Sequence, residues 1–440
     1  MADPHLHFWP ETGLTYAYAT HDFSPTNKGF KMTDWWVWSS ADLVEWSLVD
    51  VLYPNATPAP PADYANCWAT DGAHRKNPTT GAWEYFFYMS IGTCQVAVMK
   101  SVTTPHGPWA NVLGTPLLNA TFGDSLNPKA CFRDPGVFED DDGAHYIIAG
   151  VFDYYIARLG EDLVSLAEPP RLVGVVNPTG PYGAKTDDKP FIHKYGGVYY
   201  LSWGCFYGTA TSVYGPYTYV GSAIATAALA PAFQMNDTAG PWYGRQDYAD
   251  RHGSFWSNGA QQWFYASNDR THSTDVEHRS VYRDTVVGYV HYYMNGTIAP
   301  VVIDATGVGT YDARTGAIPA ENFMRAAGAR KAHLPSEGDA LVVVFDDSRG
   351  AVVEYPHVRG AAGARIVLRA ANAGERPARI VAQRGVGGAV FATCNVPAAG
   401  ALGSVACKGA LGTEDGDVAV VLSVVDGDAG AVMVDAFEFL

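Results

Sequence analysis

The first 310 residues alternate between short runs of aromatic and β-branched residues and clusters of turn-forming residues. Each run is rich in Tyr, Phe, Val and Ile and is bounded by Gly, Asn or Asp, which is typical of β-strands. Five runs recur at intervals of roughly 50 to 70 residues, the range of propeller blades. They cover residues 13–20, 81–90, 142–150, 196–204 and 260–269. We therefore predict a five-bladed β-propeller; a generic all-β protein with coincidental spacing is the alternative.

Further strand-like segments follow several of these runs. They cover residues 37–46, 96–109 and 212–221. Helical periodicity is confined to residues 221–234. The pattern of the whole chain thus predicts an all-β fold.

The composition changes near residue 320. All 12 tryptophans precede this point, the last being Trp263, and the remainder is rich in Ala, Gly and Val. A chain of 440 residues is also too long for one ordinary core. We predict a propeller over residues 1–315 and a β-sandwich of the jelly-roll type over residues 321–440, joined near Pro319.

Polar residues recur in register about ten positions before each aromatic run. In a propeller the innermost strand precedes the aromatic strand, so these positions should face the central channel. They are Asp3, Asp71, Asp134, Asp188 and His252. Each has an ordinary explanation alone, because Asp before Pro often forms a turn and a lone His is usually a core residue. Their repetition in register favours a functional cluster of carboxylates.

A ring of carboxylates suits the cleavage of glycosidic bonds. That reaction needs one protonated carboxylic acid and one ionised carboxylate, and a third carboxylate nearby can raise the pKa of the acid. Among the many tryptophans, Trp68 and Trp256 are candidates for stacking on a sugar ring, although most of the others should pack between blades. The sequence therefore predicts an oligosaccharide or polysaccharide as the partner.

Charge and hydropathy exclude other classes. The net charge is −16 and no run of Lys or Arg exists, which argues against nucleic acid. No stretch of 18 apolar residues exists that could span a membrane. Glycosylation sequons at Asn55, Asn119, Asn236 and Asn295 favour a secreted protein. The chain opens at Met-Ala-Asp-Pro without a signal peptide, so secretion would imply a start beyond this sequence; we expect a monomer.

The six cysteines form no cluster with zinc-ligand spacing. Cys394 and Cys407 lie close together and are expected to bridge two strands of the sandwich. The pairing of the others stays open. They are Cys67, Cys94, Cys131 and Cys205.

Six segments in order resemble glycoside hydrolase family 43, the five-bladed propellers that act on β-xylosides and α-L-arabinofuranosides. They read ADPHLHFWPETGLTYAYATHD, VWSSADLVEWS, CFRDPGVFEDDDG, DKPFIHKYGGVYYLSWG, HGSFW and HRSVYRDTVVGYVHYYMNGTI. The resemblance implies that Asp3 is the general base and that Asp134 modulates the pKa of the acid. The family's general acid is a Glu two residues before a Pro, and this chain has Asp188 there, one methylene shorter. Asp187 is the alternative acid.

The resemblance also implies further binding residues. His252 matches the family's central His, which is associated with a bound metal, often calcium, or with its waters, and which lies at the substrate pocket. Arg279 matches its substrate-binding Arg. Members invert configuration in a single displacement, and they need no redox or organic cofactor. The expected bonds are β-xylosidic or α-L-arabinofuranosidic, in plant or algal polysaccharide.

The C-terminal part resembles a family 6-type carbohydrate-binding module, from AENFMRAAG to VMVDAFEFL. This implies a structural calcium ion held by Glu321 and Asp435. The segment has no Trp and one Tyr, Tyr355, so a structural or degenerate role is favoured over firm sugar binding.

Two rival functions remain for the whole chain. The Arg133-Asp134-Pro135 triplet also fits a fructan-cleaving propeller of the invertase type, but the Glu-Cys and Asn-Asp-Pro-Asn motifs of those enzymes are absent. The Asp at position 188 motivates the second rival, a catalytically weak carbohydrate-binding propeller.

Overall fold

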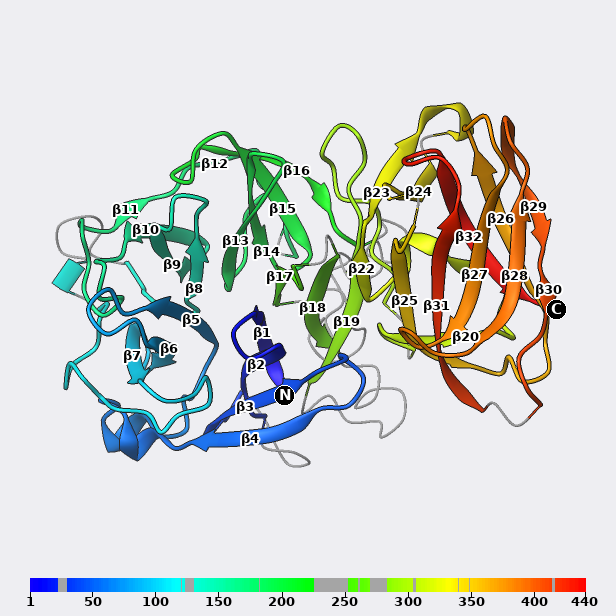
Figure 1. Cartoon of the computed structure of the whole chain (residues 1–440). Helices are drawn as coiled ribbons and strands as arrows, with labels where there is room; N and C mark the ends of the chain where they lie inside the picture. Colours follow the sequence, from blue (N-terminus) through cyan, green and yellow to red (C-terminus); the bar gives the residue numbers. More distant parts are fainter. Residues whose placement is uncertain are drawn as a thin grey trace, which may run out of the picture.

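The computed structural model consists of two β-rich parts (Figure 1). It describes residues 1–22, 30–119, 121–122, 130–181, 183–224, 252–259, 262–269, 283–303, 306–338, 340–347, 349–413 and 416–440. Within these residues no helix combines the length and the apolar character needed to cross a bilayer. Short 3-10 turns occur at η1 (Pro54–Ala56), η2 (Pro61–Asp63), η4 (Ala320–Asn322) and η5 (Pro335–Glu337). The predicted helix over 221–234 lies, from residue 225 on, outside the described residues.

In the described residues the N-terminal part contains five sheets, one for each predicted blade, and their consecutive strands pair antiparallel apart from β12 in the fourth. The first comprises β1 (Ala2–Trp9), β2 (Leu14–Thr20), β3 (Trp35–Ser40) and β4 (Ser47–Leu52). The second comprises β5 (Thr70–Lys76), β6 (Trp83–Ile91) and β7 (Gln95–Ser101), and the third β8 (Gly136–Glu139), β9 (His145–Val151), β10 (Asp153–Arg158) and β11 (Arg171–Leu172). The fourth comprises β13 (Pro190–Tyr195), β14 (Val198–Trp203), β15 (Phe206–Ala210) and β16 (Tyr217–Ser222), with β12 (Val175–Val176) parallel to β16. The fifth comprises β17 (Gly253–Ser257), β18 (Trp263–Asp269) and β19 (Asp284–Val290).

The first strands of the five sheets close a ring. β1 contacts both β5 and β17, β8 contacts β5 and β13, and β13 contacts β17. The predicted five-bladed propeller is therefore confirmed, and each of the five aromatic runs forms the second strand of its blade. The N-terminal strand lies beside the last blade, so the two ends of the propeller sequence meet.

Strand β6 shows why the aromatic runs are nearly continuous. Phe87 and Met89 pack toward the first blade, whereas Phe86 and Tyr88 pack toward the third. Because neighbouring side chains of a strand point to opposite faces, a strand buried on both faces needs apolar residues at every position. Burial of each such side chain contributes about 1.5–3 kcal/mol to stability.

The C-terminal part is a two-sheet sandwich. One sheet contains β20 (Thr310–Asp312), β22 (Arg325–Ala327), β25 (Val352–Arg359), β27 (Ala378–Arg384), β28 (Val390–Val396), β30 (Lys408–Gly409) and β31 (Asp417–Asp426). The other contains β21 (Ile318–Pro319), β23 (Ala329–Leu334), β24 (Ala340–Phe345), β26 (Ile366–Asn372), β29 (Gly400–Ala406) and β32 (Val432–Phe439). Since β20 pairs with β25, residues Thr310–Asp312 add a strand to the first of these sheets.

Two disulfides brace the molecule. The predicted Cys394–Cys407 bridge is present in the sandwich, and Cys94–Cys131 joins the hairpin turn after β6 to the segment that enters the third blade. Cys67 and Cys205 are buried and form no disulfide. The Cys94–Cys131 bridge holds the segment that carries Asp134.

Candidate active site

The entries of three inner strands share an unusual backbone conformation. Asp3, Asp134 and Lys189 have positive φ angles of 49°, 55° and 56°. This left-handed region is sparsely populated by residues other than Gly, and such residues cluster at functional sites. All three lie where the chain enters an inner strand, so the start of these strands forms the candidate site. We call the group of Asp3, Asp134, Asp187, Asp188 and His252 at these starts the hub.

Asp3 is buried and receives three hydrogen bonds on one oxygen. Asn268 Nδ2, Arg283 Nη1 and His252 Nδ1 lie 2.8, 3.0 and 3.1 Å from Asp3 Oδ1. Burial favours the neutral acid, but the charges of Arg283 and His252 hold the pKa of Asp3 well below its usual range. Asp3 is therefore ionised, and none of the described residues donates to its Oδ2.

Arg283 is a member of the site that the sequence analysis missed. Its guanidinium is buried, and Nε and Nη2 bind the carboxylate of Asp22 at 2.8 and 3.0 Å while Nη1 reaches Asp3. A fork of fixed donors suits Arg for joining two carboxylates. The predicted Arg279 lies outside the described residues.

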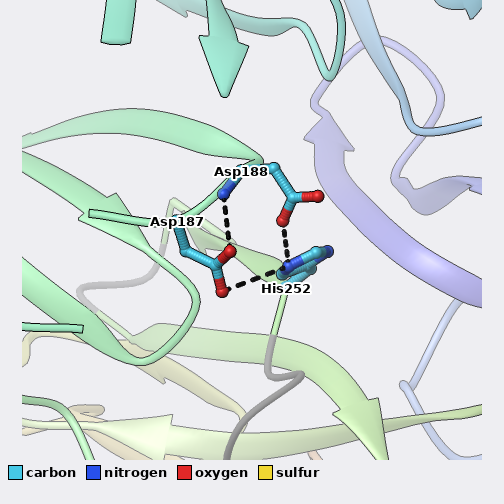
Figure 2. A group of neighbouring side chains, drawn as sticks. All are labelled: Asp187, Asp188 and His252. Carbon is cyan, nitrogen blue, oxygen red and sulfur yellow. Dashed lines mark hydrogen bonds and ion pairs between the residues drawn. The ribbon is translucent and has the colours of Figure 1, made fainter. Parts of the chain in front are cut away.

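His252 lies against Asp187 and Asp188 on one side, as Figure 2 shows, and against Asp3 on the other. Its Nε2 lies 2.5 Å from Asp188 Oδ1 and 3.8 Å from Asp187 Oδ2, while its Nδ1 faces Asp3. Burial opposes protonation, yet the charge of Asp188 and the contacts with Asp187 and Asp3 raise the pKa of His252 well above its ordinary value. His252 is thus an imidazolium that lies between carboxylates.

The adjacent Asp187 and Asp188 have opposite environments. Asp187 is buried, and burial together with the charge of Asp188 raises its pKa to about 7. The side chain of Asp188 is 25% exposed, and although burial opposes ionisation, His252 lowers its pKa. The backbone N–H of Asp188 also donates to Asp187 Oδ1 at 2.9 Å. Asp188 is the member of the pair that a substrate can reach.

Asp134 occupies the entry to the third blade. Its backbone N–H donates to Ser90 Oγ at 2.7 Å, which fixes the strained turn. Burial and the carboxylate of Asp188 raise its pKa to about 6. The predicted Asp3, Asp134, Asp188 and His252 therefore come together as one electrostatically linked group.

Asp71 is in register with these residues but belongs to the core of the propeller. It is fully buried, its two oxygens lie 2.9 Å from His5 Nδ1 and 2.6 Å from His7 Nε2, and the N–H of Val137 donates to it. A carboxylate with this many partners has a structural role. The expectation that Asp71 lines the pocket is wrong, because two imidazoles of β1 cover it.

Lys189 is a second residue that the sequence analysis missed. It is fully buried, and its Nζ donates to the carbonyl of Thr70 at 2.8 Å. Burial lowers its pKa, whereas Asp3 and Asp71 oppose that effect. The ammonium group offsets part of the negative charge that the carboxylates place in the central channel.

The two candidate tryptophans have different positions. Trp68 is half-buried, its Nε1 donates to the carbonyl of Phe30, and the guanidinium of Arg133 lies 5.1 Å from its ring. Because Arg133 Nε lies 3.7 Å from Asp134 Oδ2, Trp68 stands at the wall of the hub. The prediction that Trp256 stacks on a sugar ring is wrong. Trp256 is 5% exposed and stacks on Phe264 in the core between the fifth and first blades, so it offers no face to a sugar.

The hub contains a donor set for a cation. Ligand atoms of Asp187, Asp188 and His252 lie within 4.8 Å of one another. Carboxylates suit a hard cation such as Ca²⁺, but an imidazole must be neutral to act as a ligand, whereas His252 is held here as a cation. The geometry is therefore compatible with a metal only if His252 gives up its proton.

The sandwich contains the second predicted metal pair. Glu321 Oε2 is buried and has no hydrogen-bond partner among the described residues, and burial together with nearby Asp435 raises the pKa of Glu321 to about 7. Asp435 Oδ2 accepts from Arg369 at 2.7 Å, and Lys331 also interacts electrostatically with Glu321. The unpartnered buried oxygen fits a bound cation, which would have to share Glu321 with Lys331.

The fold and the buried carboxylates together define a β-propeller with an acidic hub, and glycoside cleavage requires paired carboxyl groups of this kind. The chain belongs to the glycosyl hydrolases family 43, whose model matches residues 5–297. Asp3 lies just before the matched range.

Curated relatives agree with this family. A β-D-galactofuranosidase of Aspergillus niger is 28% identical over 324 residues, 70% of this chain and 84% of the relative. A xylosidase/arabinosidase of Bacteroides ovatus is 26% identical over 272 residues, 50% of this chain and 77% of the relative. These identities establish the chain as similar to glycosidases of several sugar preferences.

Solved structures show the same fold. A family 43 arabinoxylan arabinofuranohydrolase from Bacillus subtilis, in complex with cellotetraose, matches 100% of this chain and 95% of its own length with a TM-score of 0.56 and 21% identity. A family 43 enzyme from Xanthomonas citri complexed with xylotriose matches 68% of this chain and 90% of its own with a TM-score of 0.51 and 24% identity.

Proposed function

We propose that this protein is an inverting glycosidase that removes xylosyl or arabinofuranosyl groups from plant or algal polysaccharide. The observation that supports this most strongly is the state of Asp3. Its ionised carboxylate has three donors on Oδ1 and none, among the described residues, on Oδ2. This leaves Oδ2 to accept a proton from an attacking water, as a general base must.

The acid is proposed to be Asp188. It stands where the family has its acidic Glu, and it is the more exposed member of the Asp187–Asp188 pair. His252 lowers the pKa of Asp188, so the proton for the leaving oxygen is proposed to come from His252. Its Nε2, 2.5 Å from Asp188 Oδ1, passes a proton to Asp188 as Asp188 protonates the leaving oxygen, which leaves His252 neutral. Asp134, with its raised pKa, is proposed to tune this proton exchange.

The names of the relatives guide the choice of substrate. They include a xylosidase/arabinosidase and arabinoxylan arabinofuranohydrolases, and also a β-D-galactofuranosidase. Trp68 lies beside Arg133, and the ring of Phe30 lies 5.1 Å from the guanidinium of Arg283, so the two aromatic side chains give the hub a wall that is suited to a sugar ring. We propose a pentosyl substrate and keep the galactofuranoside as the comparison.

Leaving-group dependence tests the acid. An activated aryl glycoside needs little protonation, so Asp188→Asn should slow its hydrolysis much less than that of an oligosaccharide. Asp187→Asn is the matched control, because it removes the neighbouring carboxyl without touching the exposed one. If Asp187→Asn shows the selective loss and Asp188→Asn does not, Asp187 is the acid.

Secretion is proposed on the sequons. Asn55 and Asn295 are exposed, as glycosylation requires, and the two disulfides suit an oxidising compartment. Expression in a eukaryotic secretory host followed by glycosidase treatment tests this. A mass shift on treatment supports it, and an unmodified chain at both sites counts against it.

A further inference from the structure

A cleft lies between the second and third blades, away from the hub. Its cavity volume is about 390 Å³, within the range of small-molecule sites. It is lined by the end of β5 and the start of β6 from one blade, and by the end of β8, the start of β9 and the loop after β10 from the next. Figure 1 shows these two sheets as neighbours. The proposed reaction uses none of these residues.

The cleft opens at the far ends of β5 and β8, away from the strand starts that face the central channel. Asp71 stands near the start of β5 and Lys76 at its end, while Asp134 precedes β8 and Glu139 ends it. Five residues of strand span about 16 Å. A sugar unit in the hub therefore does not extend into the cleft, so the cleft is a separate site.

The aromatic wall of the cleft is held rigidly. The ring of His74 stacks on the Trp83 indole with centroids 4.7 Å apart, and Trp9 stacks on His74 at 4.0 Å. His74 is also held by Glu11 at 3.0 Å. An aromatic side chain that is already immobilised loses little entropy when a ligand packs on it, which favours binding.

The polar wall offers both donors and acceptors. The guanidinium of Arg75 is fixed by Glu84 at 2.6 Å and by the carbonyl of Glu161, and Arg158 and Glu161 present exposed side chains. Glu139 is half exposed and lies 3.6 Å from His145. Cations and carboxylates nearly balance in the lining of the cleft, so its carboxylates would repel a multiply charged anion. The hydroxyl groups of a sugar ring can donate to the carboxylates and accept from the cations.

We propose that this cleft is a second, non-catalytic binding site for a neutral saccharide unit. It would hold one segment of a polysaccharide while another segment reaches the hub. Such a contact raises the effective concentration of polymer at the hub without changing the chemistry there. The proposal extends the proposed function, but its test measures binding and does not require turnover.

The test uses the full chain with Asp3→Asn, so that polymer is not consumed. Soluble neutral arabinoxylan is the probe, and affinity electrophoresis measures retardation. Arg158→Ala with Glu161→Ala removes two exposed groups, and Trp83→Ala removes the aromatic wall. We expect each change to weaken polymer binding at least 5-fold. Lys408→Ala, an exposed cation of the sandwich, is the matched control and should leave binding unchanged.

The outcomes are distinct. Undiminished binding in the Arg158/Glu161 double variant overturns the proposal, and this variant decides the matter if Trp83→Ala does not fold. Stronger retention by polygalacturonate than by arabinoxylan also overturns it, because the ligand would then be an anion. In the chain with Asp3 intact, the double variant should hydrolyse an aryl glycoside at the wild-type rate. If no aryl glycoside is cleaved but polymer binding still falls in the variants, the proposed function fails while the cleft proposal holds.

Discussion

Replacement of Arg283 should move the pH dependence of hydrolysis. Its guanidinium is the largest favourable influence on the ionisation of Asp3, and it joins Asp3 to Asp22 through side-chain contacts of 2.8 to 3.0 Å. Arg283→Met removes that charge. An opposite charge at this range lowers the pKa of a carboxyl by about 1–3 units, so its loss should raise the pKa of Asp3 by a similar amount.

The sign follows from the role of Asp3. A base works only when ionised, so kcat/KM falls as the pH drops through the pKa of the base in the free enzyme. The acid limb of the profile should therefore move to higher pH by about 1–3 units in Arg283→Met. Arg283→Lys retains a positive charge but not the fork of donors, so the acid limb of its kcat/KM profile should move less than that of Arg283→Met.

Stability provides the second readout for the same variant. Two buried carboxylates would lose the charge of Arg283, which costs about 3–5 kcal/mol in the free energy of unfolding. Arg330→Met is the matched control, because its ion pair with Asp346 is exposed and is worth at most about 1 kcal/mol. Urea unfolding and pH–rate profiles measure both effects. A folded Arg283→Met enzyme with an unmoved acid limb would refute the reasoning.

Three further predictions concern stability. Hydrogen bonds from Lys100, Asn77 and Arg75 outweigh burial and lower the pKa of Glu84 to about 2, so the stability that ionised Glu84 contributes is present above pH about 4.5 and is lost as the pH falls toward 2. In urea unfolding, Glu84→Gln should cost about 1–3 kcal/mol at pH 7 and much less near pH 3. An equal cost at both pH values would contradict this. A disulfide that closes a longer loop restricts the unfolded chain more. Replacing both cysteines of the Cys94–Cys131 bridge, which spans 37 residues, by Ala should therefore lower the free energy of unfolding by about 4 kcal/mol, against about 3 kcal/mol for the 13-residue bridge in the sandwich. The reverse order would contradict this explanation. Ca²⁺ at 100 times its Kd should stabilise the chain by about 2.7 kcal/mol, and Glu321→Gln should abolish the thermal shift; a shift that survives this change places the ion elsewhere.

The blades were predictable because their physical signal is local. A second strand that is buried on both faces must be apolar throughout, and this produced five aromatic runs that match β2, β6, β9, β14 and β18. Each inner strand lies a fixed distance before its aromatic run, so the residues at the starts of the inner strands repeat in register. This register identified Asp3, Asp134, Asp188 and His252 together.

The errors concern contacts between distant parts of the chain. Arg283 bonds to Asp22 and Asp3, more than 250 positions away, and nothing in its own segment distinguishes it from other charged residues. Asp71 shares the register of the hub, but His5 and His7 of the neighbouring blade cover it. Trp256 points into the core between two blades and not into the central channel, because successive side chains of a strand point to opposite faces.

Steady-state hydrolysis is the most direct test of the central claim. The purified chain should be assayed with aryl β-D-xyloside, aryl α-L-arabinofuranoside and aryl β-D-galactofuranoside, beside Asp3→Asn. This substitution preserves the size of the side chain but cannot take a proton from water. We predict turnover of a pentoside that falls by at least about 10²-fold in Asp3→Asn. Turnover that Asp3→Asn leaves undiminished, or no turnover of any of the three glycosides, would contradict the assignment of the hub as a glycosidase site with Asp3 as its base.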